Sequence, residues 1–304
     1  MNVSNKHISV LFNETINSLD IKEDGIYVDL TLGRAGHARK VFQKLGPKGL
    51  FIGFDKDDTA IKYSEDILSK IGNNFILIKS DFKNIKDKLE EHGISKVDGI
   101  YADLGVSSPQ IDNADRGFSY NKDSKLDMRM DQSQEFSALN LINNYSESEL
   151  VNIFVYYADV SHSLSRRVAK AIVNNRPIIK TLELVNLIRS NTPAPVLRKK
   201  NIVKKYFQAI RIEVNDEINS LKKMTIDSPY LLQIGGILSI ISFHSLEDKI
   251  IKKQFSVLTE DTSLFFEKEG SNNFISKTIK VKKNEIEKNY RARSSKLRVL
   301  KRIK

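Results

Sequence analysis

The stretch Gly25-Ile26-Tyr27-Val28-Asp29-Leu30-Thr31-Leu32-Gly33-Arg34-Ala35-Gly36-His37 decides the fold. Val28, Leu30 and Leu32 fit a buried strand, and Gly33 and Gly36 let the backbone turn tightly or approach a ligand closely. A helical pattern follows. In an α/β protein, such an entry presents backbone N–H groups outside the carboxyl end of a strand, where nucleotide-like ligands bind. The same pattern is also an ordinary α/β connection, so the rest of the chain must decide.

Length and composition narrow the class of protein. The 304 residues suffice for one large or two modest domains, and 40% hydrophobic with 29% charged residues is typical of a soluble protein. No apolar run approaches the length of a membrane span, and residues 1–6 lack a secretory signal, so we expect a cytoplasmic protein. The absence of cysteine excludes disulfides, thiolate catalysis and cysteine-bound zinc.

The charge balance points to a polyanionic partner. The chain has a formal net charge of +11 and a sequence pI of about 9.5. An excess of this size favours nucleic acid as the partner. The alternative is a biased composition, because the chain is rich in lysine, isoleucine and asparagine.

Strand and helix patterns alternate through the first third of the chain. Apolar strands are predicted at 50–55, 75–79 and 97–103, and helices at 37–45, 58–70 and 84–91. This alternation is typical of a parallel sheet with helices on both faces.

Two of these strands end in an acidic residue. Asp55 lies about twenty residues past the glycine loop, where a nucleotide-binding unit offers a carboxylate to ribose hydroxyls. It could equally be the N-cap of the next helix. Asp103 precedes Ser107-Ser108-Pro109-Gln110, which is either a plain turn or a group facing cofactor and substrate. A carboxylate at that place needs partners.

The alternation stops near residue 111, and helical patterns follow at 135–143, 147–157, 161–175, 181–190 and 214–223. We therefore expect residues 113–213 to form a helical domain inserted between residues 1–112 and 214–304. Its basic residues are either a solvated surface or contacts to RNA phosphates. The residues expected to bind RNA are Arg166, Arg167, Lys199, Lys200, Lys204 and Lys205.

Strand patterns return in the last third of the chain. An apolar strand over 235–243 leads into His244, and the acids Glu247 and Asp248 suit the first turn of a helix. A further strand is predicted over 275–280. The apolar residues within 297–300 predict that the basic C-terminal segment packs as an edge strand.

Several motifs in order resemble one family, the bacterial cytosine-N4 methyltransferases of 16S ribosomal RNA known as the MraW or RsmH type. The resemblance covers nearly the whole chain. Besides the glycine loop and residues 103–110, it rests on 7–11, 116–119 (Arg-Gly-Phe-Ser), 126–131 (Leu-Asp-Met-Arg-Met-Asp), 207–215, 242–248 and 291–294.

The resemblance implies a Rossmann-like sheet with an inserted helical domain and transfer of a methyl group from S-adenosylmethionine. The acceptor it implies is the exocyclic amine of a decoding-centre cytidine in the small ribosomal subunit. The residues it assigns to the cofactor are Ala35, Gly36, His37, Asp55, Phe82, Asp103 and Gln110.

The chain departs from the family at three places. Ala35 stands where the family has glycine, which restricts φ although the residue should still offer its N–H. The family's acidic pair in the insert is reduced to Ala158-Asp159, and residues 201–205 replace a His-Pro-Ala-Thr-Arg run. The last two changes concern how RNA is held.

Cytosine N4 is a weak nucleophile, so an acceptor hydrogen-bonded to the amine would assist methyl transfer. We expect Asp103 in this role, or holding the cofactor, with His244 as the next candidate. A histidine held in a strand-end network is the alternative for His244. No metal is required, the target base should leave its stack, and the oligomeric state stays open.

Three other functions compete with this one. A nicotinamide-dependent oxidoreductase shares the early strand–helix pattern but needs a fuller Gly-x-Gly-x-x-Gly spacing. A non-catalytic RNA-binding factor could keep the fold, and methylation could fall on another nucleotide or a protein.

Overall fold

The computed structural model describes residues 9–199, 201–259 and 273–304, without the side chains of Lys199, Lys288, Tyr290 and Arg291. The chain divides into two compact units. The sheet unit comprises Met1–Gly105 and Asn219–Lys304, and the helical unit comprises Val106–Ile218. The expected domain limits, after residues 112 and 213, stay a prediction.

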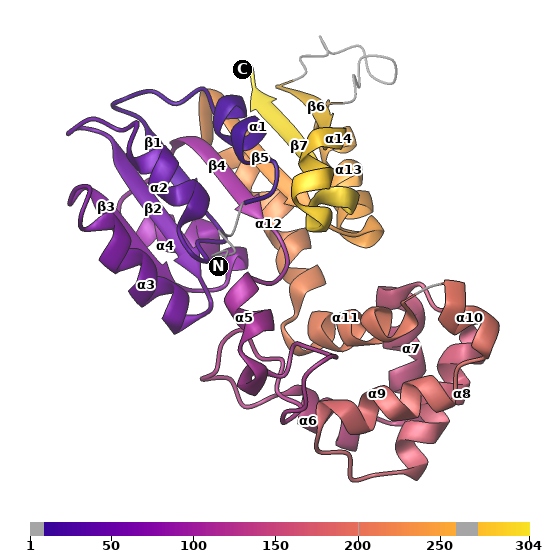
Figure 1. Ribbon diagram of the computed structural model, residues 1–304. Coiled ribbons are helices and arrows are strands. Elements are labelled where there is room, and N and C mark those ends of the chain that lie inside the picture. The colour runs from indigo at the N-terminus through magenta and orange to yellow at the C-terminus, as the bar shows by residue number, and fades with distance from the viewer. Residues whose placement is uncertain (1–8, 200, 260–272) are drawn as a thin grey trace. The chain divides into compact units, whose positions relative to one another are not determined.

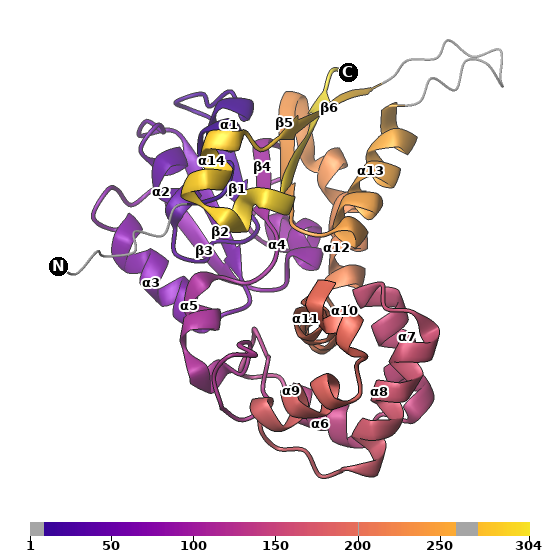
Figure 2. The same ribbon diagram turned by 45° about the vertical axis from the view of Figure 1, so that its right-hand side comes forward.

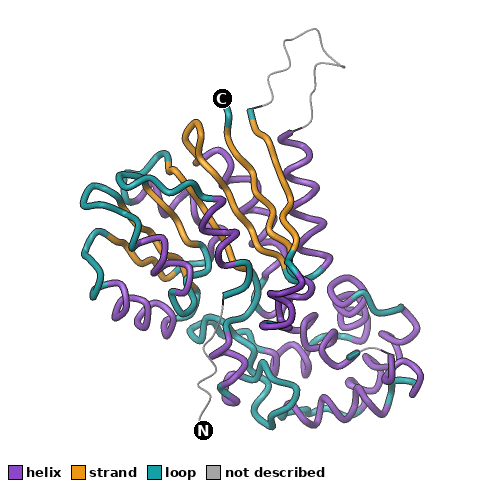
Figure 3. Tube along the Cα trace, turned by 45° about the horizontal axis from the view of Figure 1, so that its top comes forward, coloured by secondary structure: helices purple, strands orange, loops and turns teal. Residues whose placement is uncertain are grey.

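The sheet unit is built on a seven-stranded sheet of order β3-β2-β1-β4-β5-β7-β6 (Figure 3). The strands are β1 (Ile26–Asp29), β2 (Leu50–Asp55), β3 (Phe75–Lys79), β4 (Val97–Asp103), β5 (Leu232–Ser242), β6 (Phe274–Lys280) and β7 (Lys296–Arg302). Strands β1 to β4 are parallel, as the alternation of strands and helices predicts, β5 is parallel to β4, and β7 runs antiparallel to β5 and β6. The α/β fold class is confirmed.

The expectation that the C-terminal segment forms an edge strand is wrong. Strand β7 lies between β5 and β6, and β6 is the edge. Leu297 and Val299 are buried on one face and Leu300 on the other. A strand with both faces covered fits the interior of a sheet better than its edge.

Helices cover both faces of the sheet (Figure 2). On one face, the buried side chains of the sheet share a core with α1 (Phe12–Ser18), α2 (Gly36–Phe42) and α3 (Asp58–Leu68). On the other face, they share a core with α4 (Ile85–Glu91), α12 (Glu217–Leu231) and α13 (Ser245–Thr259). The 3-10 helices η1 (Phe82–Asn84) and η4 (Tyr290–Ser294) and the helix α14 (Lys283–Lys288) complete this unit.

The strand register brings the carboxyl ends of the central strands to one edge. Asp29 pairs with Gly53 of β2 and Tyr101 of β4, and Asp103 pairs with Ile241 of β5. Polar residues at the ends of β1, β2 and β4 therefore lie along the edge where ligands of such sheets bind.

The helical unit contains α5 (Ser108–Asp112), η2 (Ala114–Arg116), α6 (Ala138–Asn144), α7 (Glu147–Ala158), α8 (His162–Asn174), α9 (Thr181–Ser190), α10 (Ala194–Lys199) and α11 (Ile202–Val214) (Figure 1). These helices pack around one apolar cluster that includes Leu150, Phe154 and Tyr206.

The helix α11 is not among the predicted elements. Eight of its thirteen residues are buried, and polar Lys204, Gln208 and Arg211 recur on its other side, so the period of an amphipathic helix is present in the sequence. The helix predicted over 214–223 begins instead at Glu217 as α12. Asp216, with φ of 52°, interrupts the chain between the two helices. Within the described ranges, no helix is both long and apolar enough to cross a membrane.

Candidate active site at the carboxyl edge of the sheet

Four acidic side chains interact electrostatically along the carboxyl edge of the sheet. Burial raises the pKa of Asp29 to about 7 and that of Asp55 to about 6. Burial, with the charges of Asp29 and Glu247, raises the pKa of Asp103 to about 8. Each ionised carboxylate therefore opposes the ionisation of its neighbours, and a cationic ligand would relieve this repulsion. No such group in the described ranges is arranged to hold a metal ion.

Asp103 has one carboxylate oxygen available to a ligand. Its backbone N–H donates to Thr31 Oγ1 at 2.6 Å, and its Oδ2 lies 3.9 Å from Nδ1 of His37. Among the described residues, its Oδ1 has no hydrogen-bond partner although that atom is buried. A buried acceptor without a partner is costly unless a ligand supplies a donor. Asp103 is therefore the residue of this edge best placed to receive one.

The glycine loop is held by Asp55. Gly33, at φ of 52°, donates its N–H to Oδ2 of Asp55 at 2.8 Å. Gly36 begins α2, where a Cβ atom would lie only 2.4 Å from Oγ of Ser9. Glycine is needed at both places, at Gly33 for its backbone conformation and at Gly36 for space.

Ala35 does not offer a free N–H, contrary to the expectation from the sequence. Its φ of 54° lies in the left-handed region, and its N–H donates to the carbonyl of Leu32 at 2.8 Å. The loop closes into a tight turn on itself, which consumes this donor. Any contact from Ala35 to a cofactor would have to use its carbonyl or its methyl group.

His37 lies in the apolar core beside the site. Its ring stacks on Phe12, with ring centroids 5.3 Å apart, and meets the edge of Tyr101 at 6.0 Å. The side chain is almost fully buried. The ring therefore packs beside the carboxylate of Asp103 and is closed to solvent.

Asp55 is not the N-cap of the following helix. That role belongs to Asp57, whose carboxylate accepts the N–H of Thr59 at 3.0 Å. Asp55 accepts the N–H groups of Gly33 and Asp57. Each carboxylate oxygen can accept more than one hydrogen bond, so Asp55 can still receive ribose hydroxyls.

Phe82 is positioned by residues that sequence reasoning missed. It begins η1, whose N-cap is Asp81. The Oδ2 atom of Asp81 lies 2.6 Å from Nζ of Lys56 and accepts the hydroxyl of Ser220 at 2.6 Å. Asp81 adjoins Phe82 in the sequence, but Lys56 and Ser220 come from distant segments. No spacing rule could have joined them.

His244 is held by the first turn of α13. Glu247 accepts the backbone N–H groups of Phe243 at 2.8 Å and His244 at 3.2 Å. Its other carboxylate oxygen lies 3.0 Å from Nε2 of His244, whose Nδ1 accepts the N–H of Glu247. The contacts of the His244 backbone and of its Nδ1 are those of a strand-end network, whereas the buried Nε2 makes no hydrogen bond among the described residues. Its catalytic role stays a prediction.

Asp248, the second acid of this turn, binds β7. Its carboxylate lies 2.6 Å from both Nζ of Lys296 and Nε of Arg298. Burial alone would raise the pKa of Asp248, but the hydrogen bonds from these two residues lower it overall. The helix dipole therefore accounts for only part of the preference for an acid here.

The remaining predicted residues lie in the helical unit. Oε1 of Gln110 accepts the N–H of Ser107 in the capping box of α5, so its side chain has a local structural role. Its contact with a cofactor stays a prediction.

The predicted RNA-binding residues differ in how they are held. Arg166 is 71% exposed, with its Nε 3.4 Å from a carboxylate oxygen of Glu147, and Arg167 and Lys204 are exposed. Lys205 donates to the carbonyl of Asp159 at 3.4 Å, so it stabilises the C-terminal end of α7. Lys200 and the side chain of Lys199 lie outside the described residues.

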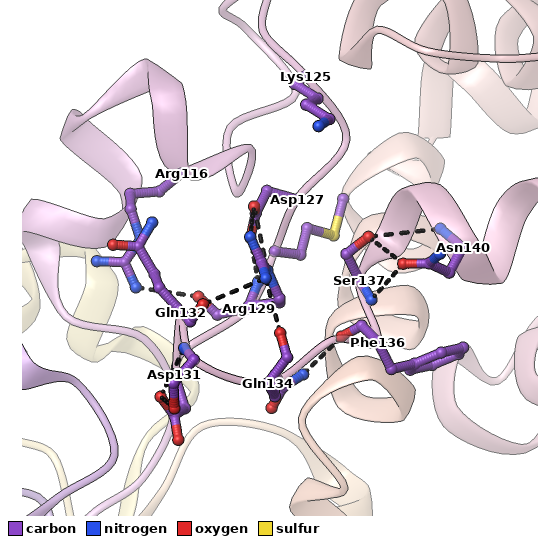
Figure 4. A network of polar contacts seen from close by, with 12 residues as sticks. Arg116, Lys125, Asp127, Arg129, Asp131, Gln132, Gln134, Phe136, Ser137 and Asn140 are labelled. Carbon is purple, nitrogen blue, oxygen red and sulfur yellow. Dashed lines mark hydrogen bonds and ion pairs between the residues drawn. The ribbon is translucent and has the colours of Figure 1, made fainter.

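The family motifs at 116–119 and 126–131 build a polar loop in the helical unit (Figure 4). Asp127 receives Nη2 and Nε of Arg129 at 2.7 and 3.0 Å. Arg129 also donates to the carbonyls of Gln132 and Gln134. The hydrogen bonds to Asp127 raise the pKa of Arg129. Asp127 and Arg129 therefore stabilise the conformation of the loop.

Asn215 fixes the same loop from the end of α11. Its amide donates to the carbonyl of Met128 at 2.8 Å, and its carbonyl oxygen accepts the N–H of Met130 at 2.7 Å. Met128 is held at φ of 57°, a conformation that costs free energy for a residue with a side chain. The Asn215 side chain thus holds the backbone of residues 128–130 in place through two hydrogen bonds.

Comparison with known proteins shows which family the chain resembles over its length. Residues 4–303 match the MraW methylase family. The chain is 51% identical over 303 residues to a protein of Mycoplasmopsis agalactiae named Ribosomal RNA small subunit methyltransferase H, with 99% of this chain and 100% of the relative covered. A protein of the same name from Mycoplasmopsis synoviae is 49% identical, with 99% of this chain and all of that one covered.

Proposed function

The chain belongs to the MraW methylase family, whose methyl donor is S-adenosylmethionine, and we propose that it methylates the exocyclic N4 of a cytidine in 16S ribosomal RNA. The name shared by its relatives supports ribosomal RNA of the small subunit as the substrate. The observation that carries the choice of an amine is the buried Oδ1 of Asp103, which has no hydrogen-bond partner among the described residues. The family assignment also removes the nicotinamide oxidoreductase alternative.

The carboxyl edge of the sheet fits the cofactor. When bound, S-adenosylmethionine supplies an electrophilic methyl group on a positively charged sulfur. The carboxylates of this edge oppose one another's ionisation, and a bound cation would lower their pKa values and be attracted to the charge that results. Asp55 would accept the ribose hydroxyls, and Phe82 would pack on the adenine. Gly36, His37 and Asp103 would lie toward the methionine end, with Ala35 and Gln110 as further contacts.

Asp103 would orient the amine and take its proton. The lone pair of cytosine N4 is delocalised into the ring, so an acceptor that hydrogen-bonds the N–H group makes the nitrogen more nucleophilic. Burial raises the pKa of Asp103 to about 8 without a ligand, and a bound cation would lower it, so that Asp103 would be ionised and able to accept the N–H of the amine. His244 would act beside it, held by Glu247.

RNA would reach the site with its target base out of the stack, because the amine must enter a pocket at the sheet edge. In the helical unit, Arg166, Arg167, Lys199, Lys200, Lys204 and Lys205 would contact phosphates. We expect this reaction in the cytoplasm, where ribosomal subunits are the substrate.

The test is methyl transfer from labelled S-adenosylmethionine to small subunits isolated from cells that lack this protein. Digestion to nucleosides and mass spectrometry should find one new N4-methylcytidine per 16S RNA. Label on carbon 5 of cytidine, on another base or on a ribosomal protein would contradict the proposal. Cofactor binding without any transfer would instead support a non-catalytic assembly factor.

A further inference from the structure

The positive charge of the chain is concentrated in its last strands. Residues 274–304 contain 12 lysines and arginines against 2 glutamates, a net charge of +10. The helical unit, residues 106–218, contains 16 basic residues against 13 acidic ones, a net charge of +3. Since the whole chain carries +11, the excess that pointed to nucleic acid lies on the sheet unit and not on the helical one.

The fold spreads this charge over an exposed surface. Residues 274–304 form β6, α14, η4 and β7, which lie side by side (the yellow segment of Figure 1). Lys277 and Lys280 project from the edge strand β6, and Lys283 begins α14. All three are exposed.

The register places Lys301 of β7 beside Lys277. Ile275 pairs with Lys301 and Lys277 pairs with Val299, so Lys277 and Lys301 are diagonal neighbours on one face of the sheet. Buried Phe274, Leu297 and Leu300 anchor the two strands that carry these lysines. The four residues Lys277, Lys280, Lys283 and Lys301 are called the β6 basic surface below.

Three of these basic side chains form ion pairs with acids of other segments. Asp248 pairs with Lys296 and Arg298, and Glu14 lies 3.5 Å from Lys282. Among the described residues, none forms an ion pair with a lysine of the β6 basic surface. In the helical unit, by contrast, Arg166 and Lys205 each have an acidic neighbour.

Protection of the sheet edge explains only part of this pattern. Lysines on an edge strand discourage pairing with another chain, which accounts for Lys277 and Lys280. It gives no reason for Lys301 on the inner strand β7 or for Lys283 on α14. Lys277 and Lys301 share one face of the sheet and Lys280 projects from the other, so the lysines surround the β6 edge. Like charges gathered around one edge repel each other, and their accumulation favours a polyanion as the occupant.

We propose that the β6 basic surface binds the phosphate backbone of RNA outside the active site. This inference rests on the proposed function, which supplies an RNA substrate. Contacts to phosphates fix the position of the RNA and carry no sequence information. The β6 basic surface thus provides affinity, while the carboxyl edge of the sheet selects the reacting base.

The test compares three variants of the full-length protein for binding to poly(U) at a series of salt concentrations. The first replaces all four lysines of the β6 basic surface by glutamine, and the second replaces them by arginine. The third, a control of equal charge change, replaces the exposed lysines Lys44, Lys48, Lys70 and Lys86 of the same unit by glutamine. Calorimetric binding of S-adenosylmethionine confirms that each variant is folded.

The glutamine variant should lose about 0.7 of the slope of log K against log salt for each lysine that contacts a phosphate, about 2 to 3 in all. Its affinity at low salt should fall more than tenfold, while the arginine variant and the control keep most of both. A glutamine variant with the slope of the control would overturn the β6 basic surface and leave the methyltransferase proposal intact. If the glutamine variant keeps the wild-type slope but no longer binds an acidic protein that the wild type binds, the occupant is that protein and the proposal is overturned. Wild-type protein that does not bind poly(U) would overturn the β6 basic surface, whereas methyl transfer to small subunits decides the proposed function.

Discussion

The carboxyl edge of the sheet and the polar loop of the helical unit use similar residues in opposite ways. In the loop, Asp127 is saturated by Arg129, and the motif builds its own scaffold. At the sheet edge, Asp103 keeps a buried oxygen without a partner among the described residues. Both stretches carry family motifs, so a motif by itself does not separate ligand contacts from structural ones. What distinguishes Asp103 from Asp127 is that one of its buried carboxylate oxygens has no hydrogen-bond partner among the described residues.

The largest expected effect follows replacement of the acceptor at the sheet edge. The Asp103→Asn substitution should lower kcat for methyl transfer by a factor of about 10²–10⁴, because it removes the base and leaves the fold intact. The measurement is single-turnover transfer to small subunits with saturating cofactor. Transfer at the wild-type rate would exclude Asp103 from the chemistry.

In the loop, the same kind of change should affect stability instead. Asp127→Asn leaves Arg129 without its bidentate partner in a mostly buried place, at a cost of about 3 kcal/mol in the free energy of unfolding. Urea unfolding measures this cost. Glu135→Gln, an exposed change of equal charge in the same segment, is the control and should cost almost nothing. Equal stabilities of the two variants would show that the network is dispensable.

A smaller effect should appear in the pH dependence of stability without cofactor. The pKa of Asp103 in the folded protein, about 8, lies above its value in an unfolded chain. Asp103 therefore contributes stability that is present at low pH and is lost as the pH rises toward 8. Between pH 7 and 8, Asp103 goes from mostly protonated to half ionised, so this loss should be about 1 kcal/mol.

The comparison between wild type and Asp103→Asn isolates the contribution of Asp103 to the pH dependence of the free energy of unfolding. Asparagine binds no proton in this range, so the variant should lose less stability than the wild type between pH 7 and 8. Chemical unfolding at each pH gives both curves. Parallel curves would mean that Asp103 ionises normally and that the carboxylates of the edge do not oppose one another.

Local pattern was sufficient for the first half of the sheet. The strands at 50–55, 75–79 and 97–103 agree with β2, β3 and β4 because each is an apolar run bounded by turn residues. Asp55 and Asp103 could be named for the same reason, since the end of a strand fixes where its last side chain lies. The family resemblance added Phe82 and the functions of the loop.

What failed depended on contacts between distant segments. The insertion of β7 between β5 and β6 and the pairing of Lys56 with Asp81 join residues that no local period relates. The N–H of Ala35 is consumed by a turn whose type residue spacing does not reveal. The helix α11 is different, because its apolar and polar residues follow a helical period that local pattern alone could have identified.

The place of β7 has a consequence for how the protein is made. Strand β6 is translated before β7, yet β7 is the neighbour that joins it to the rest of the sheet. While the ribosome is still producing the intervening residues, β6 has no docking position. The two strands must therefore enter together, as a hairpin added late to a sheet whose parallel part is already assembled. Deleting β7 should release β6 as well, and a ribosome stalled before residue 296 should hold a nascent chain with an open β5 edge.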